Sequence, residues 1–283
     1  MFGQEFMRNA LLAGTFVALA CGLSGWFVVL RGQVFAGDAL SHVAFPGALA
    51  AAAAGIDQRV GLFVATLAVG AAIGALGRGA LAGGPGGGGG GAGAAQDTAI
   101  GTAFTFILGL GVFFLALAGT SAAGAAGIVG AHTLFGSIFG LSGGEARLAA
   151  AIGLGAALLI AAIARPLLFS SLAPDVAAAR GVPVRLLGVA FAALLGVVAA
   201  EATQAVGALL LLGLLTGPAA AAHRLTRAPW VGLALAACLA IAATWGGLVL
   251  AYAIPSLPPS TAIVVLAVGT YGVAAVLTGR PER

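Results

Sequence analysis

The sequence predicts an all-α membrane protein, a transmembrane helical bundle of about eight or nine spans plus one re-entrant segment. Hydrophobic residues make up 61% of the 283 positions and charged residues only 7%, and the mean hydropathy is +1.14. Such a chain has too few polar groups to cover a water-exposed surface. Apolar runs near the 20 residues of a membrane-spanning helix recur along it. The 47 glycines favour closely packed membrane helices.

The apolar runs predict the helices in order along a single transmembrane domain, residues 1–283. The expected spans cover about 9–30, 38–55, 60–77, 98–118, 146–163, 186–200, 205–222, 230–253 and 259–278. Residues 128–141 are apolar but too short to span, and runs of that length are typical of re-entrant segments. Between the spans, residues 83–96 form a glycine-rich linker. Residues 168–185 lie in the longest polar interval of mixed composition.

The basic residues bear on topology and on function. All twelve are Arg, and most flank apolar runs, as the positive-inside rule predicts. No basic cluster indicates nucleic-acid binding. If Arg31 and Arg78 face the cytoplasm, nine of the twelve Arg do so and the N-terminus lies outside. Counting 128–141 as a full span gives the same score with the N-terminus inside, so charge alone leaves both topologies open.

The absence of Lys excludes two kinds of chemistry. A Walker A phosphate loop needs a Lys after its glycines, so the chain is no standard P-loop ATPase. A Schiff base with a retinal-type cofactor also needs Lys. We therefore expect no catalytic residues for ATP hydrolysis in this chain.

Ionisable residues inside apolar runs are costly and are candidates for function. Asp38 and His42 are four residues apart, which places them on one face of a helix. Carboxylate and imidazole groups both bind Zn²⁺ or Mn²⁺. One helix supplies two ligands, and two symmetric subunits would supply four. Ser41 could support the site, and Pro46 leaves the His42 carbonyl without its helical N–H partner. The alternative is a local Asp–His hydrogen bond and an ordinary proline kink.

Five further residues are candidates of other kinds. Asp175, Arg180 and Gly181 mark a short helix between two spans, which Asp175 would cap and Gly181 would end. This helix could dock on a partner protein or simply connect the spans. His132 and Glu201 could line a vestibule, or could lie in solvent and at the membrane boundary respectively.

Five segments of the chain resemble those of a known family. The most specific is FVVLRGQVFAGDALSHVAFPG, residues 27–47. The others are DTAIG at 97–101, LFGSI at 134–138, ARGVP at 179–183 and QAVGALLLLGLLTGPAAAA at 204–222. Together these segments resemble the metal-ion permease family of ABC transporters, which import zinc, manganese or iron. They follow the family's order and cover most of the chain. Two departures are the poly-glycine linker, where the family is usually basic, and Gly217, where a larger apolar residue is expected.

The resemblance implies a homodimeric, multi-pass permease of the bacterial plasma (inner) membrane. It implies Asp38 and His42 as pore ligands for the transported Zn²⁺, Mn²⁺ or Fe²⁺, with no permanently bound cofactor. It further implies a cytoplasmic ATP-binding subunit that meets a coupling helix near Asp175, Arg180 and Gly181. An extracellular or periplasmic metal-binding protein would deliver the ion, and alternating access would move it.

Two other classes of transporter remain open. A siderophore or cobalamin permease of the ABC type would carry a large chelate and need no Asp–His ion site. A proton-coupled secondary metal transporter would use Asp38 and Glu201 as proton carriers, and such proteins often show inverted repeats. No convincing repeat occurs in this sequence.

Overall fold

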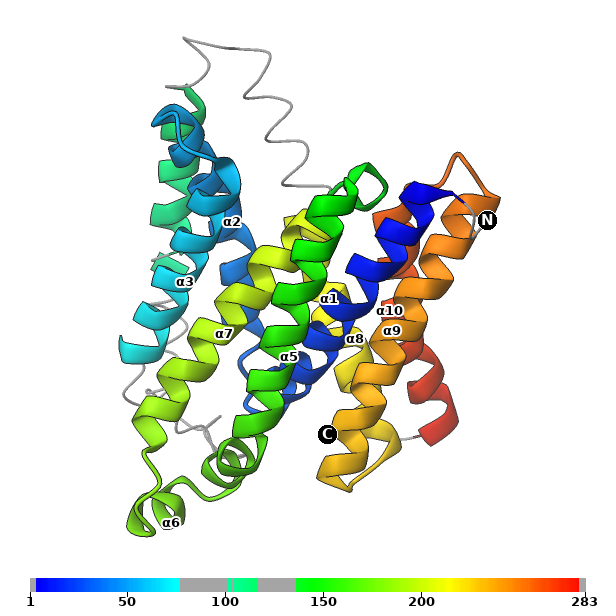
Figure 1. Ribbon diagram of the computed structural model, residues 1–283. Coiled ribbons are helices and arrows are strands. Elements are labelled where there is room, and N and C mark those ends of the chain that lie inside the picture. Colours follow the sequence, from blue (N-terminus) through cyan, green and yellow to red (C-terminus); the bar gives the residue numbers. More distant parts are fainter. Residues whose placement is uncertain (1–3, 77–100, 103, 117–135, 280–283) are drawn as a thin grey trace. The chain divides into compact units, whose positions relative to one another are not determined.

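The computed structural model describes residues 4–76, 101–102, 104–116 and 136–279 (Figure 1). The predicted linker 83–96 and His132 lie outside these residues, as does most of the predicted re-entrant segment. Within the described residues every regular element is helical, as predicted. The elements are α1 (Glu5–Leu30), α2 (Val34–Ala53), α3 (Gln58–Leu76), the helix Phe104–Ala116, the 3₁₀ turn η1 (Ile138–Gly140), α5 (Gly143–Leu172), α6 (Pro174–Ala179), α7 (Val184–Ala205), α8 (Ala208–Leu225), α9 (Pro229–Ala253) and α10 (Pro259–Thr278).

Seven of the described helices are long and apolar enough to cross a bilayer, namely α1, α2, α3, α5, α7, α9 and α10. Two further predicted spans are also helical. α8 carries His223 and Arg224 in its last turn, and the helix Phe104–Ala116 lies within the predicted span 98–118. The predicted polytopic helical bundle is thereby confirmed.

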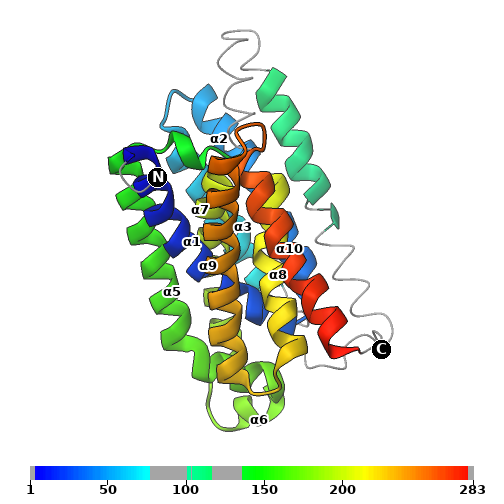
Figure 2. The ribbon, with the colours of Figure 1, turned by 90° about the vertical axis from the view of Figure 1, so that its right-hand side faces the viewer.

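Contacts divide the chain into two units. Unit 1 comprises Met1–Val29, Phe135–Leu158 and Glu201–Arg283, and unit 2 comprises Leu30–Leu134 and Leu159–Ala200. In unit 1, α10 packs on α8 and α9, which run beside it in Figure 2. A Cβ added at Gly217 would lie 2.6 Å from the Ala267 carbonyl oxygen, and one at Gly247 would lie 2.5 Å from the Ile263 Cα. Glycine is needed at both crossings because the backbones are in direct contact.

Unit 2 is built in the same way around α2 and α3, which lie side by side in Figure 1. A Cβ at Gly47 would lie 2.5 Å from the Ala65 Cβ and 2.8 Å from the Gly61 carbonyl oxygen. Ala44 and Ala48 of α2 also pack with Leu62 of α3. Small residues therefore fix α2 tightly against α3.

α5 is longer than predicted. It begins at a capping box in which the Ser142 backbone N–H and hydroxyl each donate to the Glu145 carboxylate, at 2.9 and 2.7 Å. The prediction that the helix ends near residue 163 is wrong, because α5 continues through Pro166 to Leu172. Proline removes a single helical hydrogen bond, and apolar residues follow it directly. The Ser171 hydroxyl donates to the Leu167 carbonyl at 2.6 Å, within the last turn.

Candidate functional site

Asp38 and His42 lie next to each other on α2, as their spacing predicts. The His42 Nε2 and Asp38 Oδ1 atoms are 3.8 Å apart, and the side chains are 21% and 33% exposed. This separation exceeds a hydrogen bond, so the alternative of a local Asp–His hydrogen bond does not describe the pair. A carboxylate oxygen and an imidazole nitrogen thus sit together, both partly accessible, with lone pairs suited to a transition-metal ion.

Apolar contacts orient this part of α2. Ala36 and Ala39 form a buried cluster against Ile73 of α3 and Phe104. The Phe104 ring also meets the His42 ring edge to face, with centroids 5.2 Å apart. Aromatic pairs prefer this arrangement. The helix Phe104–Ala116 thereby packs along the side of α2 that carries the imidazole.

The two predicted supporting residues, Ser41 and Pro46, act on the α2 backbone. The buried Ser41 hydroxyl donates to the Asp38 carbonyl oxygen at 2.6 Å. It therefore stiffens the turn that carries Asp38. Pro46 lies inside α2, which continues unbroken to Ala53. A Cβ at Gly111 would lie 2.9 Å from the Pro46 Cγ, so the neighbouring helix approaches closely where the proline ring protrudes.

Asp38 and His42 are too few donors to hold a metal ion by themselves. Among the residues that the structure describes, no group of three or more His, Cys, Asp or Glu side chains gathers to hold a metal ion. Zinc sites in proteins usually have four ligands, or three with an open position. Additional ligands must come from a second chain, from water or from other groups.

The short helix α6 lies in the predicted segment, but it begins before Asp175. Its N-cap is Ala173 and its first residue is Pro174, so the prediction that Asp175 caps it is wrong. Asp175 instead lies in the first turn, where its negative charge interacts favourably with the helix dipole. At the other end Gly181 has φ +79°, and the Val182 N–H donates to the Ala177 carbonyl at 3.0 Å.

The Gly181 N–H also donates to the Ala178 carbonyl, at 3.0 Å. These two bonds make a Schellman motif with Arg180 as C-cap. Asp175, Arg180 and Gly181 are therefore gathered on one compact exposed turn of the chain, as a docking element requires.

The structure does not place the two remaining predicted positions, His132 and Glu201, relative to the Asp38–His42 pair. His132 lies outside the described residues. Glu201 is 3% exposed near the end of α7 and belongs to unit 1, whereas Asp38 and His42 belong to unit 2. Three residues further on, the Gln204 carbonyl accepts the Ser137 N–H at 3.2 Å, next to η1.

A buried cluster around Arg31 was not predicted. Arg31 is 6% exposed and follows α1 directly. Its Nε donates to the Ser171 Oγ at 2.8 Å and its Nη2 to the Ser170 Oγ at 3.3 Å. The guanidinium lies 5.3 Å from the centre of the Phe191 ring on α7. Burial lowers the pKa of Arg31 to about 10. In the sequence Arg31 looks like any flanking Arg, and its partners are 139 and 140 residues away.

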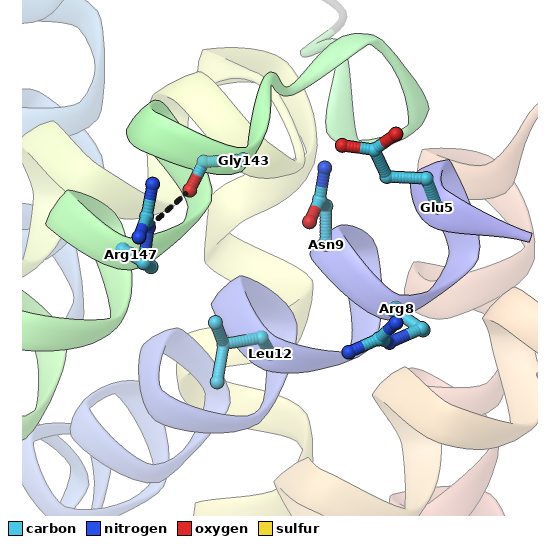
Figure 3. Close-up of a pocket in the computed structure, with 6 residues that line it drawn as sticks. All are labelled: Glu5, Arg8, Asn9, Leu12, Gly143 and Arg147. Carbon is cyan, nitrogen blue, oxygen red and sulfur yellow. Dashed lines mark hydrogen bonds between the residues drawn. The ribbon is translucent and has the colours of Figure 1, made fainter.

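A second polar feature lies at the opposite ends of the same two helices. A cavity of about 510 Å³ is lined by Glu5, Arg8, Asn9, Leu12, Gly143 and Arg147 (Figure 3). The Asn9 Nδ2 donates to the Leu141 carbonyl at 3.2 Å, and the Arg147 Nε donates to the Gly143 carbonyl at 3.0 Å. The first turns of α1 and α5 therefore lie together within unit 1.

Comparison with known proteins identifies relatives over almost the whole chain. A family model described as the ABC 3 transport family matches residues 3–278. The manganese transport system membrane protein MntC of Halalkalibacterium halodurans is 30% identical over 249 residues, which cover 88% of this chain and 79% of that protein. The probable iron transport system membrane protein of Haemophilus influenzae is 28% identical over 248 residues, 88% of this chain and 85% of that protein.

A solved structure shares the fold. The structure described as PsaBC from Streptococcus pneumoniae in complex with Fab contains a chain with a TM-score of 0.78 and 28% sequence identity. The match covers 96% of this chain and 91% of that chain. The helical arrangement is therefore common to both proteins over nearly their full length.

Proposed function

The chain belongs to the ABC 3 transport family, and from this premise we propose that it is the membrane permease of an importer for divalent transition-metal ions, Mn²⁺ or Fe²⁺. The relatives named above, described as manganese and iron transport proteins, support the choice of ion. Zn²⁺ uses the same ligand types, so it is a competitor in every test.

The observation that carries the proposal is the Asp38–His42 pair on α2. Its two donor atoms are 3.8 Å apart and both side chains are partly accessible. A homodimer with α2 from each subunit at its axis would present two carboxylates and two imidazoles to one ion. Two ligands per chain suit a transit site, because an ion that must leave again should not be enclosed by one chain.

ATP hydrolysis belongs to a separate cytoplasmic subunit. The chain has no Lys and hence no Walker A loop. The exposed turn around α6 would receive that subunit, with Asp175, Arg180 and Gly181 at the contact. A metal-binding protein on the other side of the membrane would deliver the ion.

The packing supports one of the two topologies that charge leaves open. The Arg31–Ser171 hydrogen bond joins the turn after α1 to the last turn of α5, so this turn and α6 lie on the same side. If α6 meets the ATPase in the cytoplasm, then Arg31 is cytoplasmic too. The first turn of α1 then lies outside.

The test measures metal content and metal uptake together. The permease is purified with its copurifying ATPase and equilibrated with mixed Mn²⁺, Fe²⁺ and Zn²⁺. We expect about one ion per dimer, lost in Asp38→Ala/His42→Ala, with uptake lowered about tenfold or more, as ligand-shell changes lower metal affinity. Asp57→Ala removes an exposed carboxylate beyond the end of α2 and serves as the control. If the double variant takes up metal as well as the control does, the pore-ligand assignment is wrong and a chelate-carrying permease becomes the better reading.

A further inference from the structure

We propose that Arg31 is a positioning residue that fixes the start of α2, and with it Asp38 and His42, to the chain segment from which α6 emerges. This inference rests on the proposed function, because it assumes that α6 meets the ATPase and that the α2 pair binds the ion. The inference adds a specific mechanical connection between α6 and the Asp38–His42 pair, and this connection lies within unit 2.

The Arg31 side chain joins three segments that are distant in the sequence. It leaves the turn between α1 and α2, and its Nε and Nη2 donate to the hydroxyls of Ser171 and Ser170 in the last turn of α5. Its guanidinium faces the Phe191 ring of α7, and that ring is fully buried. The contact is therefore interior to unit 2 and combines two hydrogen bonds with the approach of the guanidinium to the Phe191 ring.

The position of the cluster along the chain makes it a short connection. Arg31 is separated from Val34, the first residue of α2, by Gly32 and Gln33 alone. On the other side, only Leu172 and Ala173 lie between Ser171 and the first residue of α6. Asp38 and His42 follow in the first half of α2. A displacement of α6 thus reaches α2 through two short segments and one side chain.

The chemistry of the cluster makes it sensitive to movement. A buried charge is stable only when its hydrogen bonds are made. Here the acceptors are neutral hydroxyls, and in the described part of the chain Nη1 is buried without a hydrogen-bond acceptor. Arg can donate hydrogen bonds to both serines at once, because its planar guanidinium holds several N–H donors in a fixed geometry. The ammonium group of Lys cannot reproduce this geometry. Separation of the α5 end from the start of α2 would leave further donors unpaired, so the two move together.

The test compares Arg31→Gln with Arg165→Gln, which removes an exposed Arg from the same α5. Each permease is reconstituted in liposomes with its ATPase subunit and metal-loaded binding protein, and Mn²⁺ uptake and ATP hydrolysis are measured together. For Arg31→Gln we expect uptake per ATP to fall by about 5- to 150-fold, the range of coupling between sites. ATP hydrolysis should match the control, because the ATPase subunit is unchanged.

Equal uptake per ATP in Arg31→Gln and the control overturns the inference. So does a parallel loss of uptake and hydrolysis, which indicates a merely structural residue. If Arg31→Gln does not fold, Ser170→Ala/Ser171→Ala removes both acceptors with little change in volume. Lowered uptake per ATP in this variant supports the inference, and uptake per ATP equal to that of the control overturns it. Absence of metal uptake by the wild-type complex is a different result, because it overturns the proposed function itself.

Discussion

The contact between Gly47 and α3 gives a prediction that tests how α2 is held. In Gly47→Ala the new Cβ would lie 2.5 Å from the Ala65 Cβ. Carbon atoms in contact are normally about 3.5–4.0 Å apart, so α2 and α3 must separate by roughly 1 Å. Overpacking of this kind costs about 1–3 kcal/mol, whereas replacing a helical Gly by Ala gains about 1 kcal/mol. Gly109→Ala, in a helix position with open space around it, has the gain without the clash.

The two variants should therefore differ from each other by about 1–3 kcal/mol in stability, with Gly109→Ala the more stable. Thermal unfolding of the detergent-solubilised permease measures the difference. Metal uptake should fall in Gly47→Ala by up to about a hundredfold, because Asp38 and His42 move with α2 and a 1 Å displacement of a binding group can cost that much. Equal melting temperatures and equal uptake would refute the reasoning that direct backbone contact positions α2.

Two further predictions concern helix ends. Gly181→Ala forces a side chain into a positive-φ position, which costs about 1–2 kcal/mol. We expect weaker copurification of the ATPase subunit, with Gly155→Ala, in open space on α5, as control; unchanged copurification would show that the turn geometry of α6 does not matter. Ser142→Ala removes the hydroxyl bonded to Glu145 at 2.7 Å and should lower stability by about 0.5–2 kcal/mol. A melting temperature equal to that of wild type would contradict the capping box.

Local sequence signals predicted the order and approximate positions of the helices that the structure describes. The lengths of apolar runs located the spans, and Gly181 marked the end of α6. The helix boundaries were less predictable where a local sequence signal and the packing of the neighbouring residues favoured different helix ends. The predicted span ended near residue 163, just before Arg165, yet α5 continues to Leu172 because most of the residues after Pro166 are apolar. Burial of residues after Pro166, such as Leu167 and Ser170, outweighed the local signal for a helix end.

The site was predictable only in its local part. Asp38 and His42 share a face of one helix, so their spacing was enough to bring them together. The Arg31 cluster required knowledge of which helix ends meet. The contact of the His223 Nε2 with the Trp26 carbonyl, at 3.0 Å, is similar, because 197 residues separate its partners. Neither residue type nor spacing in a single sequence carries such information.

The length of α5 has a consequence for the surface that a cytoplasmic partner meets. Its 30 residues rise about 45 Å, which equals the thickness of a bilayer with its headgroups rather than the 30 Å of its hydrocarbon alone. The helix can therefore deliver α6 to the aqueous edge of the headgroup layer. A docking subunit would then find α6 clear of lipid in thin and thick membranes alike, since tilting of so long a helix absorbs a few ångströms of difference.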